Sequence, residues 1–488
     1  MSFVEEIQKR TNTARTANGG KAYRSSLDAC LDFFALGAAK RFHPDDAVFL
    51  FEQAYKESNV IAVKILFYIR DVRGGCGERK IFRQCVTRLY DLSPEIFSKV
   101  LPFIPSYGRW DDLFAIPITS DTINLVKQQL IADLQTDTPS LMAKWLPSEN
   151  TSSRTTRLKA KIIRERLGYS KKEYQKILSG LRSKLNLLEN SMTFNKWETI
   201  DYSKLPGQAF RKHVGAFKKH DQKRFEEFLA QVASGEKTVN TDTLYCYEVF
   251  DLIRSGHEDA ADIMWENLPA YTDKDALVVA DVSGSMMGRP MDISVSLALY
   301  FAEMCQGPFR NKFITFSQKP QLVEITGDTL SEKLKNISTS DWGMNTNLQA
   351  VFDLILNSAV AAKAAQCEMP EIIYVISDME FDACVYDSHS DNEYTFSRER
   401  TLVDKTVFED AQSKFSEFGY KLPTVVFWNC NATGNHLPVT KFDGNVALVS
   451  GASQNSFKIA VQDKSPEEVM METIGDVRYA ALNSIFRI

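Results

Sequence analysis

The sequence changes its pattern near residue 271, and this change constrains the fold more than any other feature. From about residue 26 to that point, apolar residues recur at helical spacing in segments separated by short polar turns. Beyond it, apolar runs of strand length alternate with helical segments. Such alternation is typical of a mostly parallel sheet with helices on both faces. The sequence therefore predicts an all-α region followed by a doubly wound α/β domain.

These patterns divide the chain into an N-terminal tail over 1–25, a helical repeat domain over 26–270 and an α/β domain over 271–488. A chain of 488 residues exceeds the size at which a single core stops growing, so two or more domains are expected. The helical segments share no recurring sequence motif, which favours an irregular α-solenoid of paired helices, open or closed into a ring. A helical bundle is the alternative.

In the α/β domain the expected strands are short and almost entirely apolar. They are "ALVVAD", "NKFITFS", "EIIYVISD", "TVVFWN" and "NVALVSG". The helices expected between and after them cover Met291–Cys305, Leu348–Ala365, Val403–Phe418 and Ser465–Ile485.

Composition excludes several classes of protein. No run approaches the roughly eighteen apolar residues that a membrane-spanning helix needs, and the N-terminus lacks the apolar core of a secretory signal. The eight cysteines include no Cys-x-x-Cys pair, which argues against a zinc knuckle or a disulfide framework. We therefore expect a cytoplasmic protein, a monomer or weak oligomer, without a membrane partner.

Oxygen-bearing side chains follow the expected strands where a ligand would bind. Asp281, Ser283 and Ser285 come directly after the first strand, Asp378 follows a later strand, and Thr346 lies in a loop before a helix. Ligands of open α/β sheets bind at the carboxyl ends of strands. Two carboxylates and three hydroxyls suit Mg²⁺, or Mn²⁺, with an open position for a carboxylate from a protein partner. The alternative is that Asp281 and Ser283 only cap the helix expected at Met291–Cys305.

The helical region is basic and the C-terminal region is acidic. Residues 141–240 contain 21 Lys and Arg against 10 Asp and Glu, whereas residues 271–488 contain 18 against 29. A basic region favours a polyanion such as RNA, because each neutralised phosphate releases counterions. The candidate RNA-binding residues are Arg73, Arg79, Arg154, Arg157, Lys159, Lys161, Arg211, Lys212, Lys218 and Lys219. The alternative is a solvated helix surface, in which Arg73 and Arg79 pair with Asp71 and Glu78.

Catalytic motifs do not fit the chain, and we do not expect an enzyme. A phosphotransferase of the haloacid dehalogenase type needs a second aspartate two residues after the first, and position 283 is serine. "DVSGSM" lacks the first glycine of the serine hydrolase elbow G-x-S-x-G. The phosphate-binding pattern G-x-x-x-x-G-K-[ST] is absent.

The C-terminal part resembles a von Willebrand factor A domain with a metal-ion-dependent adhesion site. The family pattern of Asp-x-Ser-x-Ser, then Thr, then Asp falls on Asp281, Ser283, Ser285, Thr346 and Asp378. One feature departs from the family. Its threonine loop commonly reads Gly-Gly-Thr, whereas this chain has "GMNT" ending at Thr346.

A second resemblance, to an uncharacterised family, extends over nearly the whole chain. "FYIRDVRGGCGERKIF", "PSYGRWDDL", "AKWLPSENTSSR" and "NVALVSG" resemble an uncharacterised family of domains of unknown function related to the Ro ribonucleoprotein. Ro joins a ring of HEAT-like repeats, the TROVE module, to a von Willebrand factor A domain, and "DVSGSM", "AEMC" and "VISDME" are similar to Ro itself.

The Ro resemblance implies an RNA-binding scaffold with a Mg²⁺-dependent protein-interaction site. Its RNA partners would be small structured RNAs, such as Y RNA-like molecules, or the single-stranded ends of defective RNAs. The alternative is a metal-dependent protein–protein scaffold that does not bind RNA.

Overall fold

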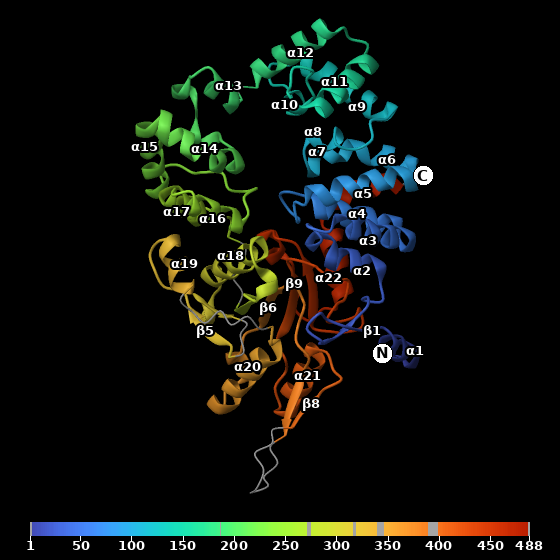
Figure 1. The fold of residues 1–488 in the computed structure, drawn as a ribbon, viewed down its shortest axis with the longest axis vertical. Coiled ribbons are helices and arrows are strands. Elements are labelled where there is room, and N and C mark those ends of the chain that lie inside the picture. The colour runs from blue at the N-terminus through green and yellow to red at the C-terminus, as the bar shows by residue number, and fades with distance from the viewer. Residues whose placement is uncertain are drawn as a thin grey trace. The chain divides into compact units, whose positions relative to one another are not determined.

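The computed structural model describes residues 2–185, 187–270, 275–315, 319–338, 346–388 and 399–486. The chain forms two units (Figure 1). Unit 1 comprises Met1–Ile65 and Leu244–Asp476, and unit 2 comprises Leu66–Thr243 and Val477–Ile488. Each unit is therefore assembled from two separate stretches of the chain.

Unit 1 is built around a six-stranded sheet with the order β10-β9-β6-β3-β4-β5. The strands are β3 (Ala276–Ala280), β4 (Lys312–Thr315), β5 (Gln321–Glu324), β6 (Ile372–Ser377), β9 (Thr424–Asn429) and β10 (Val446–Ser450). All neighbouring pairs are parallel except β4 and β5, so an antiparallel strand forms one edge. Every residue of β3, β6, β9 and β10 is buried, as expected for strands that are covered on both faces.

Helices pack on both faces of this sheet. In the C-terminal part they are α18 (Arg289–Met304), α19 (Leu330–Ser338), α20 (Leu348–Ala362), α21 (Val407–Glu417) and α22 (Pro466–Gly475). Phe457 packs against Tyr374 of β6, Trp428 of β9 and the aromatic side chains of α18, which defines one face. Phe427 precedes Trp428 in its strand, so it points to the opposite face, where it contacts Phe408 of α21.

The N-terminal residues complete unit 1. They form α1 (Phe3–Thr11), β1 (Thr13–Arg15), β2 (Lys21–Tyr23), α2 (Ala29–Leu36) and α3 (Pro44–Glu57). Helix α2 packs on β10, and Ser450 Oγ donates a hydrogen bond to the Phe34 carbonyl at 2.7 Å. Strand β2 continues into a bridge between Tyr23 and Leu437. Helices α16 (Cys246–Arg254) and α17 (Glu258–Glu266) also belong to this unit, and α16 packs on α18.

Among its described residues, unit 2 consists of helices joined by loops and contains no strand. Its helices are the end of α4 (Asn59–Arg70), then α5 (Arg79–Leu92), α6 (Pro94–Val100), α7 (Ile104–Tyr107), α8 (Trp110–Leu113), α9 (Ser120–Leu134), α10 (Met142–Trp145), α11 (Arg154–Leu167), α12 (Lys171–Lys184), α13 (Leu188–Thr193), α14 (Gly207–His220) and α15 (Gln222–Ala233). Several consecutive helices pack in pairs, including α5 with α6, α7 with α8, and α14 with α15.

The structure confirms a helical region followed by an α/β region, and it contains all five expected strands. It adds the edge strand β5, the hairpin β1–β2 and a small separate sheet of β7 (Val385–Ser388) and β8 (Glu399–Leu402). The last expected helix differs, because α22 ends at Gly475 and a 3₁₀ helix (Val477–Phe486) follows in unit 2.

The division into units does not follow the expected boundary near residue 271. Residues 1–65 and 244–270 group with the sheet because α2 covers β10 and α16 covers α18. The segment expected as a tail over 1–25 is ordered into α1 and the hairpin β1–β2. Among the described residues, no helix combines the length and apolarity needed to cross a membrane.

Candidate functional site

The two acidic residues predicted for the cation site lie close together at the carboxyl ends of two central strands. Strands β3 and β6 are parallel, with Ala280 opposite Ile376. Asp281 and Asp378 therefore follow the carboxyl ends of two adjacent strands. Their exposed fractions are only 0 and 2 %. The pairing of two buried apolar strands therefore brings two carboxylates together at the end where α/β proteins bind ligands.

Hydrogen bonds hold these carboxylates in place. Asp281 accepts one from the Ser283 amide at 2.9 Å and one from Ser377 Oγ at 2.6 Å. Ser283 and Ser285 place their hydroxyl oxygens 3.0 Å apart. Oδ1 of Asp378 accepts from the Glu380 amide at 3.1 Å. The other oxygen, Oδ2, is buried and makes no hydrogen bond within the part of the chain that the structure describes.

The site disfavours two unneutralised negative charges. Burial, followed by the nearby charge of Asp378, raises the pKa of Asp281 to about 6. Burial also raises the pKa of Asp378 above its usual range. A bound proton or a bound cation relieves this repulsion, because either one reduces the buried negative charge.

Thr346 reaches the same region from the loop before α20. Its side chain is buried, and its hydroxyl donates to Asp382 Oδ1 at 2.7 Å. The hydroxyl also accepts a hydrogen bond from Asn18 Nδ2 at 2.7 Å. The residues just before Thr346, where the sequence "GMNT" departs from the Gly-Gly-Thr pattern, lie outside the described residues.

The tip of the N-terminal hairpin, residues 16–20, rests on the loop that carries Asp378. Asn18 Nδ2 also donates to the Glu380 carbonyl at 2.5 Å, and the Ala17 amide donates to Glu380 Oε2 at 2.6 Å. Thr16 Oγ1 donates to the Phe381 carbonyl at 2.6 Å. These contacts join residues more than 360 positions apart in the sequence, so the hairpin tip forms part of the site.

The helix-capping alternative does not fit the structure. Helix α18 begins at Arg289 with Gly288 as its N-cap, and no side chain caps it. The short 3₁₀ helix Gly284–Met286 has Ser283 at its N-cap without a side-chain hydrogen bond. Asp281 instead accepts from the Ser283 amide and from Ser377. The oxygen side chains therefore face one another rather than a helix end.

The donor set fits a hard divalent cation. Two carboxylates and the hydroxyls of Ser283 and Ser285 lie together, and Mg²⁺ prefers oxygen ligands of this kind. The Thr346 hydroxyl is linked to the loop of Asp378 through Asn18. The buried Oδ2 of Asp378, which lacks a hydrogen-bond donor among the described residues, is the kind of atom that a cation would satisfy. Ser285 is exposed, so one side of the set faces solvent.

Sequence reasoning missed four residues of this site: Asn18, Ser377, Glu380 and Asp382. The Asn18-Gly19 pair between two short runs is a recognised hairpin signal. That signal predicts the turn, but it does not predict where the turn packs. Ser377 precedes Asp378 in "VISDME" and carries no motif of its own.

A second acidic group has a structural explanation. Asp28, Cys30 and Glu57 have ligand atoms within 4.8 Å of one another. Asp28 caps α2 by accepting from the Leu31 amide, and Glu57 accepts from the Ala29 amide at 2.9 Å. Both carboxylates thus stabilise the start of a helix.

The ten predicted RNA-binding residues all lie in unit 2 and fall into two groups. Some are used by the fold itself. Lys159 Nζ donates to the Phe114 carbonyl at the end of α8, at 2.7 Å, and burial lowers its pKa. Arg157 donates to two carbonyls just before α11, and Arg211 donates to Gln208. Lys218 is half-buried.

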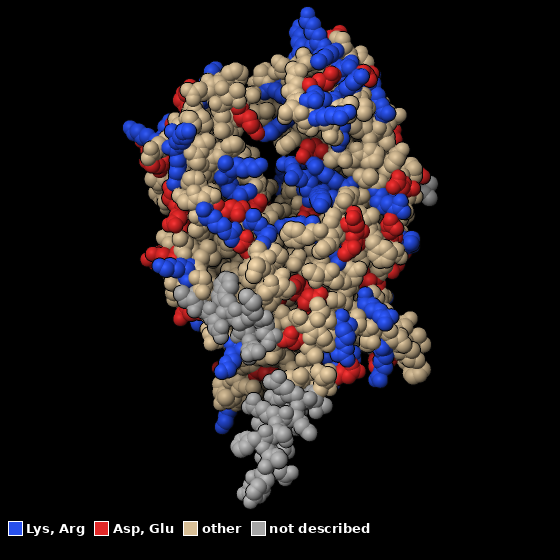
Figure 2. Space-filling model, viewed as in Figure 1, with Lys and Arg blue, Asp and Glu red and all other residues tan. Residues whose placement is uncertain are grey.

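The other predicted residues are exposed, as is Arg157. They are Arg73, Arg79, Arg154, Lys161, Lys212 and Lys219. Among the described residues, Lys161 makes only a long ion pair, 3.9 Å, with Glu165 of its own helix. Figure 2 shows Lys and Arg side chains gathered over α11 and α12. This part of unit 2 therefore presents positive charge to solvent.

The turn around Gly74 and Gly75 does not use the expected ion pairs. Arg79 pairs with Asp111 at 3.8 Å rather than with Glu78. Asp71 accepts from the Arg73 amide and from the side chains of Arg478 and Tyr479. A Cβ at Gly74 would lie 2.8 Å from Arg478, so the glycine leaves room for the C-terminal segment.

Comparison with known proteins places the chain in a family. Residues 16–106 and 103–276 match the family model described as Domain of unknown function (DUF2828), and residues 275–481 match Domain of unknown function (DUF7788). The chain belongs to the DUF2828 family. It is also 32% identical over 497 residues to Uncharacterized protein L728 of Acanthamoeba polyphaga mimivirus, which covers 92% of this chain and 84% of the viral protein.

The candidate site draws on both matched segments. Asp281 and Asp378 fall in the DUF7788 match, whereas Asn18 falls in the DUF2828 match. The two matches meet at residues 275 and 276, close to the change of pattern near residue 271. The site therefore depends on residues from both sides of that point.

Asp281→Asn should stabilise the protein when divalent cations are removed with a chelator. The carboxyl has a folded-state pKa of about 6, above its ordinary value, so its ionisation above pH 6 costs up to about 3 kcal/mol. The melting temperature of the variant should exceed that of wild type at pH 7.5, and the difference should shrink toward pH 5. The exposed Asp463→Asn serves as the control. A variant that is less stable than wild type by the same amount at every pH would contradict the assignment.

Gly20→Ala should test the position of the hairpin tip. An added Cβ would clash with the Phe381 carbonyl oxygen and would lie 2.8 Å from that of Asp382. We expect a loss of about 1–3 kcal/mol in unfolding free energy, because backbone atoms on both sides must shift. Gly444→Ala is the matched control, since a Cβ there meets nothing within 4 Å. Equal melting temperatures for the two variants would show that the tip does not pack there.

Proposed function

We propose that this protein is a Ro-like scaffold that binds a protein partner through a divalent cation in unit 1 and RNA through unit 2. In this proposal unit 1 contains a von Willebrand factor A-like domain with a metal-ion-dependent adhesion site. Unit 2 corresponds to the HEAT-like repeats of a TROVE module. The protein acts by binding and not by catalysis.

One observation carries the cation part of the proposal. Two buried carboxylates lie at the ends of adjacent parallel strands, and one of their oxygens lacks a hydrogen-bond donor among the described residues. Asp281, Ser283, Ser285, Thr346 and Asp378 would hold Mg²⁺ or Mn²⁺. A cation with only two carboxylate ligands has open positions beside them, so it would attract a carboxylate of a partner protein.

The fold of unit 1 supports the same proposal. Its sheet of parallel strands with one antiparallel edge strand carries helices on both faces, and the oxygen ligands sit at the carboxyl ends of β3 and β6. In unit 2, consecutive helices that pack in pairs support a repeat architecture of the HEAT kind.

The RNA part rests on the exposed basic residues of unit 2. Arg154 and Lys161 lie on α11, and Lys212 and Lys219 lie on α14. Cations on a helix surface bind phosphate without sequence preference, so structured RNAs would be distinguished by shape and by accessible ends.

The competing proposal is a protein scaffold without RNA binding, and one observation favours it. Leu158 and Ile162 are 55 and 43 % exposed on α11, among the same basic residues. Exposed apolar side chains beside charges also suit a protein partner. The two proposals share the cation site and differ only in the partner of unit 2.

We propose a cytoplasmic location. None of the eight cysteines forms a disulfide, and seven of them are buried. This pattern suits a reducing compartment.

Asp378→Asn should abolish Mg²⁺ binding, because it removes one of two negative charges at the cation while keeping the side-chain volume. Calorimetry should detect binding to wild type and to the exposed control Asp463→Asn, but not to Asp378→Asn. Added Mg²⁺ should raise the melting temperatures of wild type and of the control but not that of Asp378→Asn, since a ligand stabilises the state that binds it. Unchanged affinity in Asp378→Asn would show that the cation site is assigned to the wrong residues.

Reversing Arg154, Lys161, Lys212 and Lys219 to Glu should strongly weaken the binding of a small structured RNA. The plot of log affinity against log salt should become flatter by roughly 0.7 to 0.9 for each phosphate that is no longer neutralised. The control reverses the same number of exposed cations in unit 1: Arg310, Lys335, Lys363 and Lys421. If wild type binds no RNA at low salt, the protein scaffold without RNA replaces this proposal, and if both variants bind RNA alike, the four residues are not the RNA site.

A further inference from the structure

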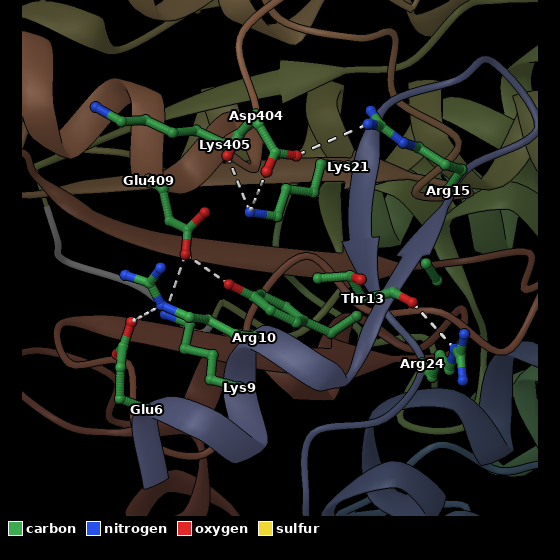
Figure 3. A pocket seen from close by; sticks show the side chains of 12 residues that line it. Glu6, Lys9, Arg10, Thr13, Arg15, Lys21, Arg24, Asp404, Lys405 and Glu409 are labelled. Carbon is green, nitrogen blue, oxygen red and sulfur yellow. Dashed lines mark hydrogen bonds and ion pairs between the residues drawn. The ribbon is translucent and has the colours of Figure 1, made fainter. Parts of the chain in front are cut away.

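A polar cavity of about 740 Å³ lies beside the N-terminal hairpin of unit 1, away from the carboxylates of the candidate cation site. Its walls come from α1, the hairpin β1–β2 and the start of α21 with the loop before it (Figure 3). Six of its twelve lining residues are cationic: Lys9, Arg10, Arg15, Lys21, Arg24 and Lys405. Only three are acidic, namely Glu6, Asp404 and Glu409. The cavity therefore has an excess of positive charge.

One ion-pair cluster forms a fixed wall of this cavity. Lys9 Nζ lies 2.7 Å from Asp443 and 3.2 Å from Glu409, and its side chain is 11 % exposed. Tyr23 donates to Glu409 Oε1 at 2.5 Å. These contacts attach α1 and β2 to α21, so the cavity has a defined shape before any ligand enters.

Two cations of the cavity have only neutral partners. Arg24 Nε donates to the Thr13 carbonyl at 3.0 Å, and Lys405 Nζ donates to Ser413 Oγ at 2.8 Å. Within the described ranges, no carboxylate lies within 4.0 Å of the charged groups of either residue. Neither charge is therefore neutralised by a described carboxylate.

Two further cations share a single loosely held carboxylate. Asp404 lies 3.7 Å from Arg15 and 3.8 Å from Lys21, and its own side chain is 81 % exposed. Figure 3 shows both cations directed toward it from the hairpin. The pair with Arg15 is exposed on both sides and contributes little free energy, whereas Lys21 is 15 % exposed and also donates to the Asp404 carbonyl at 2.9 Å. A phosphate group carries more charge and more acceptor oxygens, so it can replace this carboxylate.

We infer that this cavity binds a small soluble anion that carries two or more phosphate groups. The lining cations belong to three segments, which are α1, the hairpin with the residue after it, and the loop before α21, and this suits separate phosphates of one ligand. Arginine presents paired donors to phosphate oxygens, and lysine adds a point charge. The volume lies within the roughly 300–1,000 Å³ of pockets that enclose small molecules. A site of this size fits a compact ligand better than a polymer.

The test is calorimetry on the full-length protein with inorganic pyrophosphate and tripolyphosphate, in chelator and at two salt concentrations. Wild type should bind tripolyphosphate more tightly than pyrophosphate, and both more weakly at higher salt. The double variant Arg24→Gln, Lys405→Gln removes two charges without breaking an ion pair, and it should lower the affinity by about tenfold or more. The control Arg310→Gln, Lys335→Gln removes two exposed charges elsewhere in unit 1 and should bind like wild type.

A second measurement distinguishes a soluble ligand from a lipid headgroup. Wild type is sedimented with phosphatidylcholine vesicles that contain phosphatidylinositol bisphosphate, with and without tripolyphosphate. The inference predicts that vesicles capture little protein. It is overturned if wild type binds neither soluble probe at low salt, or if the cavity variant and the control bind equally. Capture by vesicles without binding of the soluble probes would also overturn it.

Discussion

Two carboxylates buried next to each other are the constraint on which the candidate site depends. Asp281 and Asp378 follow the central strands β3 and β6, and neither can move without disturbing two fully buried strands. Carboxylates in such a place are costly unless protons, hydrogen-bond donors or a cation compensate them. The surrounding hydroxyls and amides supply part of that compensation, and they leave one oxygen of Asp378 without a donor among the described residues. The arrangement is costly without a ligand and well suited to one.

The hairpin tip, residues 16–20, supports the candidate cation site from outside the sequence region that contains the predicted ligands. The loop that carries Asp378 and Glu380 is held from outside by Thr16, Ala17 and Asn18. A fragment that begins near residue 271 would contain all five predicted cation ligands, but it would lack these supports. It would also expose the face of β10 that α2 covers. A fragment of the protein that preserves the cation site should therefore include the N-terminal stretch of unit 1, Met1–Ile65.

The sequence was most informative where a local pattern determines the structure. Strands such as "EIIYVISD" are buried on both faces, so their composition alone predicts them, and strand ends then predict where oxygen ligands gather. Strand β5 was missed because it is a short edge strand with three of four residues exposed. The packing of the hairpin tip was missed because it depends on residues more than 360 positions away. The roles of Lys159 and Arg157 were missed for a related reason, since their backbone acceptors carry no side-chain motif.

The discontinuity of unit 1 has a consequence for how the protein is made. The Phe34 carbonyl and its donor Ser450 are 416 residues apart. At about 5–20 residues per second, the ribosome needs roughly 20 to 80 s to produce the second after the first. During that interval α2 can pack on α3, but the part of α2 that packs on β10 has no sheet to cover. Most of unit 2 is complete long before, because its main stretch ends at Thr243. Biosynthesis therefore requires the N-terminal segment to remain soluble, or to be shielded by a chaperone, until the last strands emerge.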